Sequence, residues 1–104
     1  MNQQVMLKKI KKMQDEMVAT QNEIENTVFE ASAGGVVTIE MYGSKELKAV
    51  KVADDFKPED KEDFEMLSDM IVAACSDAYK QIDKTTKEKM AKYQALLGGF
   101  GGMF

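Results

Sequence analysis

Lysine is the residue type whose spacing in this sequence suggests a chemical role. Four lysines surround Ile10 in the segment LKKIKKMQ, and they are Lys8, Lys9, Lys11 and Lys12. With a helical rotation of 100° per residue, two of them flank the side of Ile10 and two lie opposite it. Ammonium groups on flexible stems act as point charges, which suits contacts with phosphates. The segment predicts either a phosphate-binding surface or a solvated helix face.

A second group of lysines occurs near the end of the chain. Its members are Lys80, Lys84, Lys87, Lys89 and Lys92. Asp83 precedes Lys87 by four residues and Glu88 precedes Lys92 by four, which is the favourable order for ion pairs within one helix. On the sequence alone, a solvated helix crossed by ion pairs and a second phosphate-binding surface therefore explain this group equally well.

Net charge gives no support to a polyanionic partner. The chain carries 14 lysines, no arginine and 18 acidic residues, for a formal charge of −4. A bulk electrostatic argument disfavours nucleic acid, so only the distribution of charge along the chain can favour it.

The residues needed for most catalytic sites are missing. The sequence has no histidine, and it has neither a phosphate-binding loop nor a dinucleotide-binding glycine pattern. Cys75 falls on an apolar helix face and is expected to be a core residue, and one cysteine cannot form an internal disulfide or a zinc site. We expect no enzymatic activity, no cofactor, no metal and no small-molecule substrate. No segment resembles a signal peptide or a membrane span, which predicts a cytoplasmic protein without a membrane partner.

Hydrophobic periodicity predicts a helix over residues 3–27, with Asn2 as its N-cap. Its apolar seam, expected to serve a dimer interface or the core, consists of Met6, Ile10, Met13, Met17 and Ile24. Two threonines interrupt the heptad pattern of this seam, so an independent coiled coil is not expected.

A period of two residues then predicts three strands, over residues 28–32, 37–41 and 47–53. Gly34 and Gly35 are expected to supply the positive φ angles of a tight hairpin turn. A second helix is predicted over residues 60–97, ending at Gly98-Gly99. Residues 1–97 should form a single domain, and residues 98–104 a flexible glycine-rich tail.

The predicted order defines an α+β, two-layer α-β-β-β-α fold with a three-stranded antiparallel meander. The helices should be about 36 Å and 55 Å long, whereas a compact domain of this size is only about 30 Å across. Both helices should therefore project as N- and C-terminal arms. An exposed methionine-rich seam on such an arm predicts a homodimer.

Several segments together resemble one known family. They are MLKKIKKMQDEM, AGGVVTIEMYG, KAVKVADD, DKEDFEMLSDMIVAACSDAYKQIDKTTKEKM and the glycine-rich end with Met103-Phe104. In this order and at these spacings, they resemble the YbaB/EbfC family of bacterial nucleoid-associated proteins. The resemblance implies a tweezer-like homodimer that binds DNA with little sequence preference in the nucleoid. This chain differs from many members in lacking arginine.

Combined with the resemblance, the lysine pattern favours DNA as the partner. The residues expected to contact its phosphate backbone are Lys8, Lys9, Lys11, Lys12, Lys84, Lys87, Lys89 and Lys92. The alternative is a protein-interaction clamp or scaffold, which would use methionine-rich helical arms without nucleic acid, because methionine adapts to varied partners.

Overall fold

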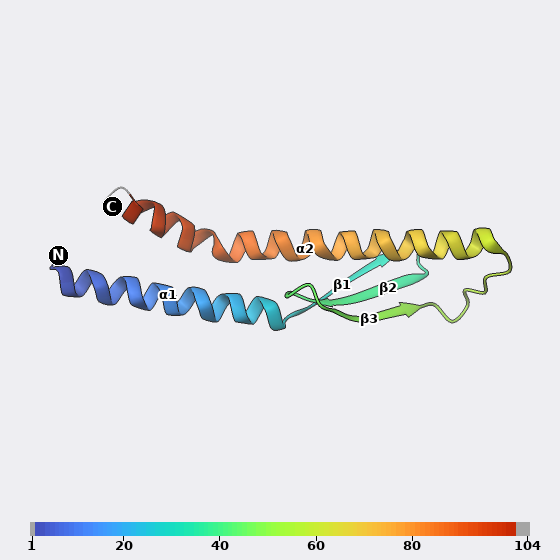
Figure 1. Cartoon of the computed structure of the whole chain (residues 1–104), viewed down its shortest axis with the longest axis horizontal. Coiled ribbons are helices and arrows are strands. Elements are labelled where there is room, and N and C mark those ends of the chain that lie inside the picture. Colours follow the sequence, from blue (N-terminus) through green and yellow to red (C-terminus); the bar gives the residue numbers. More distant parts are fainter. Residues whose placement is uncertain (1, 102–104) are drawn as a thin grey trace.

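The chain folds as a helix, three strands and a second helix (Figure 1). The computed structural model describes residues 2–101 and the side chains of residues 2–96. The elements are α1 (Gln3–Asn26), β1 (Val28–Ala33), β2 (Val37–Tyr42), β3 (Leu47–Val52) and α2 (Lys61–Gly101). The predicted α+β fold class is confirmed, and each element other than the end of α2 lies within one residue of its predicted bounds.

The predicted end of the second helix is wrong. Helix α2 continues through Gly98 and Gly99 to Gly101. A glycine inside a helix costs only about 1 kcal/mol relative to alanine, so a glycine pair weakens the last turns without having to end them. Residues 102–104 of the predicted tail lie outside the described residues.

The predicted start of α1 and the predicted first hairpin turn are both confirmed. The side chain of Asn2 accepts a hydrogen bond of 2.8 Å from the backbone N–H of Val5, which confirms it as the N-cap. Gly34 and Gly35 have φ angles of 60° and 65°, as the predicted turn between β1 and β2 requires.

The sheet is antiparallel with the strand order β1-β2-β3, and α2 packs across one face of it. Small side chains on α2 let the helix approach the sheet closely. The buried residues of this interface are Ala31, Val37, Ile39, Met41, Ala74, Ala78 and Ile82. The other face carries polar residues, including Glu40, whose carboxylate pairs with Lys51 at 2.6 Å and Lys48 at 3.8 Å. One buried face and one polar face are typical of an antiparallel sheet.

A tight contact attaches α1 to the sheet at the turn between β2 and β3. The N–H of Gly43 donates to the carbonyl oxygen of Thr27 at 2.8 Å, and the N–H of Ser44 donates to that of Glu25 at 3.3 Å. A Cβ atom on Gly43 would overlap the carbonyl oxygen of Ile24. Glycine at this position therefore lets the turn cap the C-terminal end of α1.

The molecule is elongated, with extents of 72 × 22 × 15 Å and a radius of gyration of 20.4 Å. A compact chain of this length would have a radius of about 13 Å. Helix α1 extends away from the sheet, and the second half of α2 runs antiparallel beside it (Figure 1). We call α1 together with residues 84–101 of α2 the arm. The prediction that both helices project is therefore correct.

The expectation of an exposed seam on α1 is wrong in part, because part of the seam packs within the same chain. Met13 and Ile24 are buried, and Met6, Ile10 and Met17 are half-buried. Tyr93 of α2, only 3% exposed, packs into this helix pair, and its hydroxyl lies 3.2 Å from that of Thr20. The seam therefore holds the arm together within one chain, and its exposure does not support a dimer.

Candidate nucleic-acid interface

The first lysine group lies at the free end of the arm. Lys8, Lys9, Lys11 and Lys12 are all exposed on the first half of α1. Two of them, Lys9 and Lys12, line a shallow groove of about 290 Å³ between α1 and α2, together with Met13, Glu16 and Leu96. We call residues 3–14 the arm tip; this segment contains four lysines and no carboxylate.

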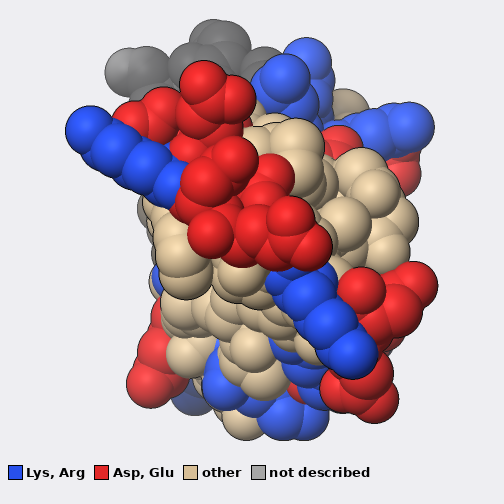
Figure 2. All heavy atoms as spheres, turned by 90° about the vertical axis from the view of Figure 1, so that its right-hand side faces the viewer, with Lys and Arg blue, Asp and Glu red and all other residues tan. Residues whose placement is uncertain are grey.

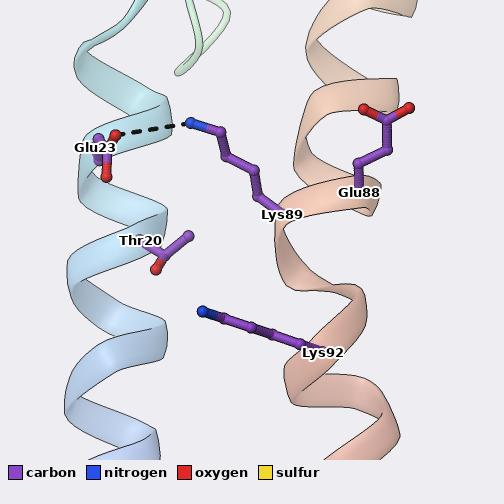
Figure 3. Close-up of a pocket in the computed structure, with 5 residues that line it drawn as sticks. All are labelled: Thr20, Glu23, Glu88, Lys89 and Lys92. Carbon is purple, nitrogen blue, oxygen red and sulfur yellow. Dashed lines mark ion pairs between the residues drawn. The ribbon is translucent and has the colours of Figure 1, made fainter.

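The second lysine group lies nearer the sheet and is divided between two sides of α2. Lys89 and Lys92 line a groove of about 360 Å³ with Thr20, Glu23 and Glu88 (Figure 3). Lys84 and Lys87 are also exposed, but helical rotation puts them about 140–160° away from Lys89 around the axis. The predicted DNA-contacting lysines thus follow the arm along its length and do not form one compact patch.

Acidic residues interrupt the lysines on the grooved side of the arm. Glu16 lies beside Lys9 and Lys12 in the first groove, and Glu23 and Glu88 line the second. Because α1 and α2 are antiparallel, the two lysine groups lie at different positions along the arm. The first groove joins Met13 to Leu96, and the second joins Thr20 to Lys92. On the grooved side of the arm, both lysine groups therefore have carboxylates beside them, and the arm tip adjoins Glu16.

The ion pairs expected within α2 do not form in the part of the chain that the structure describes. Asp83 pairs instead with Lys45 at 3.0 Å, and Glu88 has no ion pair with Lys92. The turn between β2 and β3 brings Lys45 next to α2, where its ammonium also lies 5.9 Å from the centre of the Tyr79 ring. Asp83 thus pairs with Lys45, which is distant in sequence, and not with Lys87 four residues away. The ammonium of Lys87 is therefore available to an external anion.

Among the described residues, only one of the eight predicted DNA-contacting lysines forms an ion pair. Lys89 lies 3.7 Å from the carboxylate of Glu23. Lys92 places its ammonium 4.9 Å from the centre of the Tyr93 ring, a cation–π contact. Most of the lysine charge on the arm is therefore available to an external anion.

The opposite end of the molecule is acidic. Residues 54–69, which we call the acidic end, contain eight carboxylates and two lysines. Figure 2 shows carboxylates gathered over this end, which faces the viewer and lies farthest from the chain termini. The charge of the described residues is therefore unevenly distributed, with the acidic end and the lysine-bearing arm tip at opposite ends of the molecule.

Sequence reasoning missed Thr20, which lines the second groove, and Tyr93, which is hydrogen-bonded to it. Thr20 was taken as a defect of the apolar seam, and Tyr93 was not singled out. The position of Tyr93 could have been predicted from its spacing. It follows the buried Ile82 by eleven residues, which places it on the same side of α2. The hydrogen bond between Thr20 and Tyr93 joins residues 73 positions apart, which no local pattern predicts.

On the polar face of the sheet, one ion pair shifts the pKa values of both of its members. A hydrogen bond from Lys51 lowers the pKa of Glu40, and the same contact raises the pKa of Lys51. This pair lies on the sheet and not on the arm, so it concerns stability and not the candidate interface.

The described residues offer neither a metal-binding cluster nor a membrane-spanning helix. In that part of the chain, no group of three or more His, Cys, Asp or Glu side chains is placed to hold a metal ion. Nor is any of its helices both long and apolar enough to cross a membrane.

The fold and the charge distribution define a small α+β protein with a basic helical arm. The model of the YbaB/EbfC DNA-binding family matches residues 1–97. The chain belongs to the YbaB/EbfC DNA-binding family.

Relatives of similar length support this assignment. A nucleoid-associated protein of Lactococcus lactis is 43% identical over 96 residues, covering 89% of this chain and 93% of the relative. A nucleoid-associated protein of Clostridium novyi is 41% identical over 107 residues, covering 100% of this chain and 90% of the relative. The crystal structure of an uncharacterized protein from Helicobacter pylori has the same fold, with a TM-score of 0.71 at 20% identity, covering 90% of this chain and 98% of the other.

Proposed function

We propose that this protein is a nucleoid-associated protein that binds double-stranded DNA with little sequence preference, through lysine contacts to backbone phosphates. The observation that carries the proposal is the arm tip, a segment that has four exposed lysines and no carboxylate of its own and lies at the end of the molecule opposite the acidic end. Membership of a DNA-binding family and the names of the relatives support DNA as the polyanion and the bacterial cytoplasm as its location.

The residue types on the arm support binding without base readout. Arginine can read guanine through a planar group that forms paired hydrogen bonds, whereas lysine is a compact point charge on a flexible stem that suits phosphates. The exposed cations of the arm are all lysines, and phosphate contacts carry no sequence information directly. We therefore expect affinity to depend on salt far more than on sequence.

We further propose that the protein acts as a tweezer-like homodimer, joined through the side of the sheet that α2 leaves open. Helix α2 covers β1 and β2, whereas Leu47, Val50 and Val52 of β3 remain 47%, 40% and 40% exposed on the same apolar face. Tyr79 borders this strip through its contact with Lys45, and Val72 lies two helical turns earlier on the same side of α2 and is 68% exposed. A second copy that covers this strip would leave both arms free.

The dimer is tested by sedimentation velocity on the full chain and on Val50→Lys. We expect a dimer for the unchanged protein and a folded monomer for the variant, because a buried unpaired lysine is strongly disfavoured at an apolar interface. Leu7→Lys, at an exposed position on α1, serves as the control. A monomeric unchanged protein at micromolar concentration, or a Val50→Lys dimer as tight as the control, contradicts this interface.

DNA binding is tested by fluorescence anisotropy with two unrelated 30-base-pair duplexes at several salt concentrations. We expect similar affinities for both duplexes and a linear fall of log affinity with log salt, with a slope of about −0.9 for each phosphate neutralised. An absence of binding at low salt, or an affinity that salt does not change, rules out the proposal.

The alternative, a protein-interaction clamp, gains less support from the methionines of α1. Met13 is buried, and Met6 and Met17 are half-buried. A pull-down after nuclease treatment distinguishes the two functions, since protein partners that persist without DNA would favour the clamp.

A further inference from the structure

The groove beside Thr20 gathers several donors from both helices of the arm. Figure 3 shows Lys92 extending from α2 across the gap toward Thr20 on α1, with Lys89 above it reaching Glu23. The groove measures about 360 Å³, and among the described residues it is lined by Thr20, Glu23, Glu88, Lys89 and Lys92. Two ammonium groups thus point into one space between the helices.

The hydroxyl groups at the groove leave one donor unused. Thr20 and Tyr93 share a single hydrogen bond of 3.2 Å, in which either can donate. Each hydroxyl carries one proton, so when Tyr93 donates, the proton of Thr20, which lines the groove, is available to a further acceptor there. Together with Lys92, this donor defines a site for the oxygen atoms of an anion.

A carboxylate of the protein already occupies part of this site. Glu23 lies 3.7 Å from the ammonium of Lys89, and both side chains are largely exposed. A carboxylate oxygen and a phosphate oxygen accept the same charge-assisted hydrogen bonds from lysine. Glu23 therefore takes the place beside Lys89 that a phosphate oxygen would otherwise occupy.

We infer that this groove binds one backbone phosphate of DNA and that Glu23 competes with that phosphate for Lys89. The inference rests on the proposed function, to which it adds one contact site and a residue that weakens binding. The same competition would make the arm a low-affinity, readily exchanging binder, since the phosphate must displace an internal anion that remains tethered nearby.

Removal of the competing charge gives the sharpest test. Glu23→Gln keeps the size of the side chain and frees Lys89, so DNA affinity at low salt should rise by about twofold to fivefold, the range set by exposed ion pairs. The salt slope should become steeper by up to about 0.9, because one more lysine can neutralise a phosphate. Glu62→Gln, at the acidic end, makes the same change in net charge far from the groove and should leave both quantities nearly unchanged.

A double-variant comparison assigns the gain to Lys89. In the Lys89→Gln background, Glu23→Gln should give little or no increase in affinity, because the lysine over which the anions compete is absent. Thermal melts of all variants, read by circular dichroism, check that each is folded. A gain that persists in the Lys89→Gln background, or equal gains from Glu23→Gln and Glu62→Gln, overturns the competition while DNA binding by the unchanged protein stands.

A second readout does not depend on duplex binding. In a titration of the full chain with inorganic phosphate, NMR signals of the Thr20 methyl group and the Tyr93 ring should shift in a saturable manner, and at lower phosphate concentration in Glu23→Gln. Shifts that fail to saturate, or that occur equally at lysines throughout the chain, overturn the groove site. Saturable shifts in a protein that fails to bind duplexes would retain the site and reject the proposed function.

Discussion

The contact between Gly43 and the end of α1 should make alanine at this position severely destabilising. The new Cβ would overlap the carbonyl oxygen of Ile24, so the turn must move away from α1. That movement disrupts two backbone hydrogen bonds, of 2.8 Å and 3.3 Å, each contributing about 0.5–1.5 kcal/mol. It also uncovers part of Ile24, which is 1% exposed, at a cost of up to about 1.5–3 kcal/mol.

The expected loss for Gly43→Ala is therefore about 3–5 kcal/mol in the free energy of unfolding. Urea denaturation followed by circular dichroism measures it, at a fixed protein concentration because a dimer makes stability depend on concentration. Gly35→Ala is the matched control: its φ angle of 65° is unfavourable for alanine, but no atom lies within 4 Å of the new Cβ, so about 1–2 kcal/mol is expected. A Gly43→Ala loss no larger than that of the control would refute this explanation of how the arm is attached.

Two further predictions concern the sheet. Ile39→Ala should lower the free energy of unfolding by about 2–5 kcal/mol, because Ile39 is fully buried beneath α2. The control is Leu7→Ala, at a side chain on α1 that is 61% exposed. In the same denaturation assay it should change the free energy of unfolding by less than about 0.5 kcal/mol. The Lys51 contact that lowers the pKa of Glu40 stabilises the fold above the unfolded pKa, and this stabilisation is lost as pH falls through the lower folded pKa. Glu40→Gln should therefore be less stable than the unchanged protein at pH 6, and denaturation curves at lower pH should show the difference shrinking; a constant difference would contradict this origin.

The fold was largely predictable because its elements carry local signals. A repeat of two residues marked the strands, the seam of α1 marked a helix, and Asn2 and Gly34-Gly35 marked a cap and a turn. The end of α2 was not predictable in this way, since glycine weakens a helix without specifying where it stops.

The candidate site was only partly predictable, because its contacts join distant segments. Residue type and spacing singled out the lysines. Their partners depend on tertiary approach: Asp83 pairs with Lys45 from another element, and Lys89 pairs with Glu23 across the arm. Helical spacing alone favoured partners four residues away, and it gave no indication that α2 would cover the seam of α1.

The central claim, that the arm tip binds DNA phosphates, is tested by comparing two fourfold lysine-to-glutamine variants of equal charge. One variant changes the arm tip, at Lys8, Lys9, Lys11 and Lys12. The other changes lysines outside the arm, at Lys48, Lys51, Lys57 and Lys61. Anisotropy titrations with one duplex over a range of salt should show much weaker binding for the arm-tip variant. Its log–log salt slope should be shallower by up to about 3.6 per chain, at about 0.9 for each lost contact. The control should keep nearly the slope of the unchanged protein, and equal loss of affinity and slope in the two variants would contradict the claim.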